Sequence, residues 1–342
     1  MGRRAVILAG LLASMGVICP TRAGRTSQNT PQLARWLERF PAADTNRDGI
    51  LTATEANSYR QGRRQSNPTM KPTHADVSYG PHERNVLDFW QAASEAPAPL
   101  VIFIHGGGFV GGDKSLANDA HCRQCLEAGV SFAAINYRFR NPTPLTDVIR
   151  DLARAVQFLR SEAETLNIDK TRIAVYGGSA GAGSSLWLAF HDDLADPDSP
   201  DPVLRESTRV TAAGALSTQA TYNTDRWPEV LNMDPEQEVF SAWRKSQNRL
   251  AGDPGAAAKE AAAKKFLDML AHMDADDPPI YLNSQGPDEP DADIVHHPRH
   301  AKFVKKKCDE LGIEAILVVR ETPRDERVEV IDFLLTHLRV LA

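Results

Sequence analysis

Short apolar runs alternate with longer amphipathic segments from residue 76 to the end of the chain. Runs rich in β-branched and aromatic residues, each as long as one strand, predict strands that are buried on both faces. They occupy 99–104, 131–137, 172–177, 209–217, 278–284 and 314–319. Ahead of them, 77–80 and 85–90 have the pattern of two short antiparallel strands.

Helical periodicity fills the intervals between these strands. In 147–166 the apolar positions fall on one face of a helix, and they are Val148, Leu152, Ala155, Val156 and Leu159. Segments 181–192 and 328–341 are also predicted helices, and the polar stretch 221–277 contains further helical pieces. Alternating strands and helices predict an α/β fold with a mostly parallel sheet over 76–342.

The first 23 residues have a different pattern. Two arginines precede an apolar run that ends near Cys19, and the two positions that a signal peptidase reads carry the small residues Thr21 and Ala23. We therefore expect a signal peptide over 1–23 and a secreted or periplasmic protein. Lipidation at Cys19 is less favoured, because the residue before it is bulky. No later segment has about 18 consecutive apolar residues, so no membrane span is expected in the mature chain.

Residues 30–65 form a separate segment with an acidic loop between two amphipathic stretches. Loop positions 1, 3, 5, 7 and 12 are occupied by Asp44, Asn46, Asp48, Ile50 and Glu55. Side-chain oxygens and the carbonyl at position 7 are hard ligands of the kind that Ca²⁺ prefers, and Gly49 at position 6 permits the sharp turn. The segment resembles an EF-hand, which implies a single, structural Ca²⁺ site. Residues 66–75 are polar and are expected to be a linker.

Composition narrows the classes of function. The chain has 342 residues, of which 42% are hydrophobic and 25% charged, and this excludes a disordered protein, a coiled coil and a small disulfide scaffold. Its net charge of −6 does not favour nucleic-acid binding. We therefore examine the motifs that indicate binding or catalysis of small molecules.

Two glycine motifs follow predicted strands. Residues 177–181 read GGSAG between a strand and a helix, the context in which a strained turn lifts a nucleophilic serine, Ser179, above the sheet. Residues 105–109 read HGGGF after the strand 99–104. Consecutive glycines expose backbone N–H groups, so Gly107, Gly108 and Ala180 are expected to stabilise the oxyanion that forms when a serine attacks a carbonyl.

The order HGGGF, INYR and GGSAG resembles the α/β-hydrolase superfamily, within it the hormone-sensitive-lipase-like bacterial carboxylesterases. The resemblance covers about 76–342 and implies the α/β-hydrolase fold, an eight-stranded, mostly parallel sheet flanked by helices. It also implies cap helices within 221–277 and a Ser–acid–His triad that hydrolyses carboxylic esters. Short-chain or carbohydrate-linked esters are the expected substrates, and no cofactor is expected for catalysis.

The resemblance places the acid in the loop after the seventh strand. Asp288 is the preferred residue there, and Asp291 and Asp293 are alternatives. It places the base after the eighth strand, but the loop 320–329 contains no histidine. Our candidate base is His296, because it is nearest to the acid loop.

Two other histidines, His297 and His300, are open alternatives for the base. The sequence therefore leaves two functions open. The first is a secreted carboxylesterase-like serine hydrolase, favoured because both glycine motifs are intact. The second is a catalytically silent binding protein on a hydrolase scaffold, favoured by the missing histidine, since fold alone does not fix function.

Overall fold

The computed structural model describes residues 26–28, 33–34, 37–38, 41–52, 55–56, 70–140, 142–240, 256–289 and 292–340. The expected signal peptide, Cys19 and Asp291 lie outside the described residues. The chain divides into two compact units, 1–69 and 70–342. In the part of the chain that is described, no helix is long and apolar enough to span a membrane.

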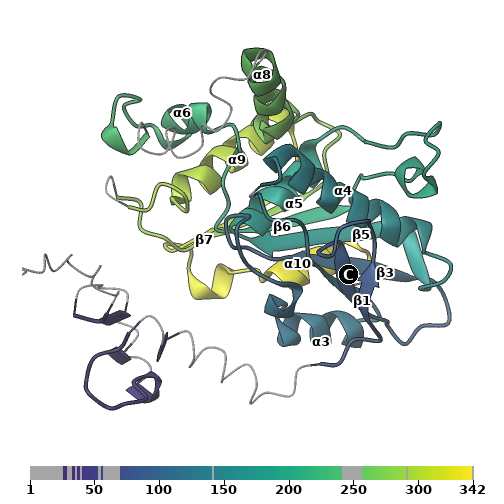
Figure 1. Cartoon of the computed structure of the whole chain (residues 1–342), viewed down its shortest axis with the longest axis horizontal. Helices are drawn as coiled ribbons and strands as arrows, with labels where there is room; N and C mark the ends of the chain where they lie inside the picture. Colours follow the sequence, from purple (N-terminus) through teal and green to yellow (C-terminus); the bar gives the residue numbers. More distant parts are fainter. Residues whose placement is uncertain are drawn as a thin grey trace, which may run out of the picture. The chain divides into compact units, whose positions relative to one another are not determined.

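The larger unit is built on one eight-stranded sheet, in the order β1-β2-β4-β3-β5-β6-β7-β8 (Figure 1). The strands are β1 His74–Ser78, β2 Val86–Trp90, β3 Ala98–Ile104, β4 Ser131–Ile135, β5 Ile168–Gly178, β6 Ala212–Leu216, β7 Ile280–Ser284 and β8 Ala315–Val319. β2 pairs antiparallel with both β1 and β4, and every other pair is parallel. The expected α/β-hydrolase fold with a mostly parallel sheet is confirmed.

Helices cover both faces of this sheet. The α-helices are α3 Asp119–Glu127, α4 Leu145–Ser161, α5 Ala180–Phe190, α6 Trp227–Leu231, α8 Ala256–Leu267, α9 Pro298–Leu311 and α10 Val330–His337. Short 3₁₀ turns lie at η1 Pro41–Ala43, η2 Lys114–Leu116, η3 Pro202–Arg205, η4 Thr224–Arg226, η5 Met269–Ala271 and η6 Arg324–Glu326. In Figure 1, α4, α5 and α9 lie on one face, and α3 and α10 lie on the other.

Strand β3 shows how the sequence fixes these layers. All seven of its residues are buried. Leu100, Ile102 and Ile104 pack in the core under α4, α5 and α9, whereas Val101 and Phe103 pack with α3 and α10. Because successive side chains of a strand point to opposite faces, only a continuous apolar run can serve both layers.

The stretch expected to form a cap, 221–277, contains η4, α6, α8 and η5. Hydrogen bonds connect its described part to the helical layer that includes α5 and α9. The indole N–H of Trp187 donates to the Phe266 carbonyl at 2.7 Å, and Arg299 Nη1 donates to the Leu231 carbonyl at 2.6 Å. Figure 1 shows α6 and α8 beside α9 at this side of the sheet.

Candidate active site

The turn from β5 into α5 presents Ser179. Its backbone has φ 55° and ψ −117°, a strained conformation for a residue with a side chain. The Ser179 amide is held by the Leu216 carbonyl at 2.9 Å, which ties the turn to the neighbouring strand. A Cβ at Gly177 or at Gly181 would collide with the Ile104 carbonyl, so the glycines let the turn lie against the end of β3.

The backbone N–H groups of Gly107, Gly108 and Ala180 are the expected oxyanion donors. Gly107 and Gly108 have φ of 118° and 61°, in the region that favours glycine. Within the described residues, neither of their N–H groups has a protein acceptor. Ala180 is the first residue of α5, so its N–H has no partner inside the helix. These are donors of the kind that stabilise an oxyanion.

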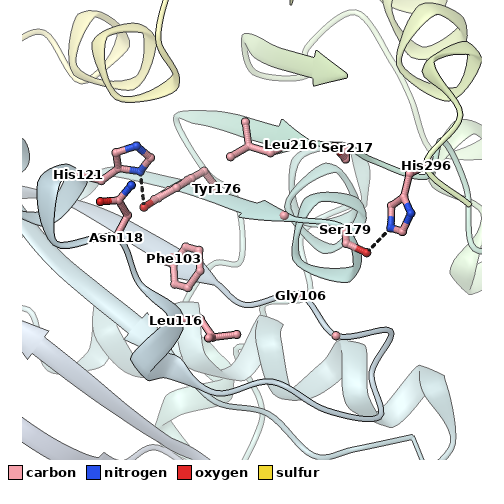
Figure 2. Close-up of a pocket in the computed structure, with 12 residues that line it drawn as sticks. Phe103, Gly106, Leu116, Asn118, His121, Tyr176, Ser179, Leu216, Ser217 and His296 are labelled. Atoms are coloured by element: carbon pink, nitrogen blue, oxygen red, sulfur yellow. Dashed lines mark hydrogen bonds between the residues drawn. The ribbon is translucent and has the colours of Figure 1, made fainter. Parts of the chain in front are cut away.

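A histidine lies against the serine. His296 Nε2 is 2.8 Å from Ser179 Oγ, and His296 Nδ1 is 2.6 Å from Asp293 Oδ2 (Figure 2). The serine, the imidazole and a carboxylate therefore form one hydrogen-bonded chain, the arrangement of a Ser–His–acid triad. Burial favours a higher pKa for Asp293, but the hydrogen bonds from His296 and the Val295 amide outweigh it and hold the pKa below its ordinary value.

The acid expected from the sequence, Asp288, is elsewhere. Its carboxylate accepts from Lys302 Nζ at 2.7 Å and from Arg299 Nε at 2.8 Å. Lys302 and Arg299 also hold the pKa of Asp288 below its ordinary value. Asp288 is thus occupied in ion pairs with α9, and the alternative acid, Asp293, is the carboxylate that His296 contacts. The spacing D-x-x-H, which brings Asp293 and His296 together on one turn, was the signal in the sequence.

The turn that carries His296 is fixed at several points. The Asp293 carboxylate accepts from the Val295 amide at 2.9 Å, and the His296 amide donates to the Asp293 carbonyl at 3.2 Å. Gln219 Nε2 donates to the Val295 carbonyl at 2.9 Å. A ring nitrogen of His300 hydrogen-bonds the Ile294 carbonyl at 2.9 Å.

The alternative candidates for the base, His297 and His300, have structural roles, and so does His105 of the glycine motif. His297 caps α9, with Nδ1 accepting from the Arg299 amide at 3.3 Å and Nε2 hydrogen-bonded to the Glu289 carbonyl. His300 is fully buried, and burial lowers its pKa to about 4. His105, in the glycine motif, is also buried, stacks on Tyr137, and has its pKa lowered to about 4 by burial. None of these three is bonded to Ser179.

A cavity of about 670 Å³ opens beside Ser179. Its lining includes Phe103, Gly106, Gly107, Leu116, Asn118, His121, Tyr176, Gly178, Ser179, Leu216, Ser217 and His296. Most of this surface is apolar, with Ser179 and His296 at one side (Figure 2). Ligand sites in proteins commonly have this character, an apolar hollow with a few placed polar groups.

Comparison with known proteins places the chain in a family. The profile of the BD-FAE family matches residues 87–296, which is more than half of the chain and includes Ser179 and His296. The chain belongs to the BD-FAE family.

Several curated relatives of this BD-FAE member have esterase names. It is 32% identical over 215 residues to a probable carboxylic ester hydrolase, LipM, of Mycobacterium tuberculosis, which covers 60% of this chain and 46% of LipM. It spans half or less of the length of the curated relatives it matches.

Solved structures resemble this BD-FAE member in fold. A truncated carbohydrate esterase from gut microbiota has a TM-score of 0.60 at 20% identity, covering 80% of this chain and 99% of that one. Esterase B from Lactobacillus Rhamnosis (HN001) has a TM-score of 0.53 at 18% identity, covering 85% of each chain. At these identities the likeness concerns the fold.

The acidic loop of this BD-FAE member lies outside the family match, in the smaller unit. The Asp44 carboxylate accepts from the amides of Arg47 and Gly49, both at 2.8 Å, and Gly49 has φ 78°. Asn46 and Asp48 each accept from the amide two residues on, at 3.0 and 2.8 Å. The loop is therefore a succession of tight turns that its own side-chain oxygens stabilise.

Further hydrogen bonds hold the end of this loop. The Glu55 carboxylate accepts from the Thr52 amide and hydroxyl at 3.0 and 2.7 Å, and the hydroxyl bond first of all lowers the Glu55 pKa. Leu51 is bonded to Ser27, whose amide donates to the Leu51 carbonyl at 2.8 Å. Across the described residues, no three His, Cys, Asp or Glu side chains are grouped so as to hold a metal ion.

Proposed function

We propose that this protein is a serine hydrolase that acts on carboxylic esters. The observation that carries the proposal is the hydrogen-bonded chain from Ser179 Oγ through His296 to Asp293. A serine without a base is a weak nucleophile near neutral pH. The loop after β8 contains no histidine, and His296, whose Nε2 is 2.8 Å from Ser179 Oγ, supplies the base instead. The esterase names of the curated relatives support the same reaction class.

The proposed reaction runs in two halves. Ser179 Oγ attacks the ester carbonyl carbon while His296 Nε2 accepts the hydroxyl proton, and Asp293 stabilises the imidazolium. The N–H groups of Gly107, Gly108 and Ala180 stabilise the oxyanion. His296 then gives its proton to the alcohol oxygen as the bond from carbon to that oxygen breaks, which leaves an acyl-Ser179. Water then attacks the acyl carbon while His296 accepts one of its protons. The acid is released, and His296 returns that proton to Ser179 Oγ.

A fluorophosphonate probe tests this proposal, because it reacts readily only with an activated serine. We expect the wild-type protein to be labelled and Ser179→Ala to remain unlabelled. Ser217→Ala is the matched control, since Ser217 also lines the cavity but has no histidine bonded to it among the described residues, and it should be labelled like the wild type. Absence of labelling in folded wild-type protein would support the silent binding protein instead.

We also propose, from the sequence, that 30–65 is an EF-hand that binds one Ca²⁺ in a structural role. The residue types and the turn order of Asp44, Asn46, Asp48 and Glu55 fit calcium, as does the φ of Gly49. On binding, Ca²⁺ would supply a positive charge that these oxygens surround. No step of the proposed hydrolysis depends on it.

Calorimetry tests the calcium proposal without any activity measurement. Titration with CaCl₂ should give a binding heat for the wild type and none for the double variant Asp44→Ala, Glu55→Ala. Asp325→Ala with Glu326→Ala removes the same charge from the exposed η6 turn and should keep the heat. The same calcium heat in the loop variant as in the wild type would exclude this site.

The substrate and the compartment are proposals as well. Short-chain esters and carbohydrate-linked esters are the classes to screen, because one structural neighbour is a carbohydrate esterase. Export is proposed from the composition of 1–23.

A further inference from the structure

The cavity has a polar end that the proposed reaction does not use. Asn118, His121 and Tyr176 line it there, and we call them the distal polar group. In Figure 2 they lie on the opposite side of Ser179 from His296, with Phe103, Leu116 and Leu216 toward the middle. Polar groups placed at one end of an apolar cavity orient the ligand and provide specificity.

Hydrogen bonding in this group determines what it offers. Tyr176 is buried, and its hydroxyl is 3.1 Å from His121 Nδ1. In the described part of the chain the hydroxyl has no other hydrogen-bond partner, and we therefore assign the phenol as the donor and Nδ1 as the acceptor. Burial lowers the pKa of His121 and outweighs the charge of Glu329, which raises it, so the neutral ring is favoured. A neutral ring that accepts at Nδ1 carries its own proton at Nε2, and that N–H has no partner among the described residues.

Asn118 adds a second donor. Its Oδ1 caps α3 by accepting from the Ala120 amide at 2.9 Å. The side-chain oxygen is thereby used, while the Nδ2 amide protons have no acceptor within the described residues. The distal polar group therefore presents N–H donors. It suits a ligand oxygen that accepts hydrogen bonds.

The position of His296 decides which half of the ester reaches this group. In the proposed reaction His296 protonates the leaving alcohol, so the alcohol oxygen must lie within hydrogen-bond reach of Nε2. The acyl chain must then extend away from His296, past Phe103 and Leu216 (Figure 2). The far end of the acyl chain is the part that meets Asn118 and His121.

We propose that the enzyme selects acyl groups that carry a hydrogen-bond-accepting oxygen at their far end, which His121 Nε2–H and Asn118 Nδ2–H recognise. This inference rests on the proposed serine hydrolase function. An apolar chain of equal length would cover the half-buried His121 Nε2–H without bonding it, and a site that bonds an oxygen disfavours the analogue that lacks it, whereas the exposed Asn118 amide can bond water instead.

Matched p-nitrophenyl esters test the proposal. One is the heptanoate, and the others replace one methylene of that chain, from the fourth carbon outward, by an ether oxygen. Chain length and leaving group are constant, and an ether only accepts hydrogen bonds. For the best-placed oxygen we expect the wild type to prefer the ether ester by about tenfold in kcat/KM. His121→Phe should remove most of the preference and still hydrolyse the heptanoate.

Two further variants keep the test independent of folding. Asn118→Ser retains a good helix cap but removes the amide donor, and should reduce the preference by about threefold. His74→Phe, an equal change on the exposed β1 strand outside the cavity, should leave the preference intact. An equal preference in the wild type and both cavity variants would overturn this inference alone. Absence of Ser179-dependent hydrolysis of the whole series would overturn the proposed function with it.

Discussion

Replacing His296 by alanine should reduce kcat for a p-nitrophenyl ester by about 10⁴- to 10⁶-fold, the loss seen when serine hydrolases lose their base. His296 Nε2 is the ring nitrogen beside Ser179 Oγ, and within the described residues no second histidine is bonded to that hydroxyl. The KM should change little, because the imidazole acts on the proton of the reacting hydroxyl. Steady-state kinetics with active-site titration measure both.

His297→Asn is the control for this experiment. His297 is the next residue along and caps α9, a role that asparagine also performs well. Its kcat should remain near the wild-type value. If His297→Asn lost as much activity as His296→Ala, the base would not be the histidine at Ser179, and the fall would report damage to the turn before α9.

The sheet could be predicted because its signal is local. Runs such as 99–104 must be apolar on both faces to lie between two helical layers, and this shows in the sequence without any knowledge of their neighbours. β3 and β5 are adjacent although they are far apart in the chain, and the glycine motifs at their ends therefore meet. Ser179 and the HGGG loop could be placed for the same reason.

The acid was harder to place, because its identity depends on side-chain partners that are distant in sequence. Asp288 and Asp293 lie in the same acidic loop, and the resemblance favoured the former. What separates them is α9, whose Lys302 and Arg299 take the Asp288 carboxylate. The i,i+3 spacing of Asp293 and His296 is a local feature, but it indicates a hydrogen bond only once the turn between them is known.

The base also shows why position in sequence is a weak guide. The loop after β8 has no histidine, yet His296 reaches Ser179 from the segment before α9. Gln219, which follows β6, donates to Val295, and His300 bonds Ile294. Long-range contacts of this kind orient the turn, and the periodicity of the chain does not reveal them. A triad is defined by such geometry.

Asp293→Asn should lower kcat by about 10²- to 10⁴-fold, whereas Asp288→Asn should leave it near the wild-type value. An asparagine at 293 can still accept from the Val295 amide, so the turn is retained, but it is uncharged and does not stabilise the imidazolium. The Asp293 side chain is 61% exposed, so solvent and salt screen part of its charge. The lower end of the expected loss in kcat is therefore smaller than the loss on removing the charge of a buried acid.

Asp288→Asn is the matched control for Asp293→Asn, because it makes the same change in size and charge within the same loop. It removes ion pairs to Lys302 and Arg299, and such partly exposed pairs contribute about 0–1 kcal/mol to the free energy of unfolding. Kinetics of both variants, with urea unfolding to measure stability, separate the two roles. A larger fall in kcat for Asp288→Asn would return that residue to the triad, and equal falls would mean that the loop tolerates neither change. The expected asymmetry follows because only Asp293 touches the imidazole that touches Ser179.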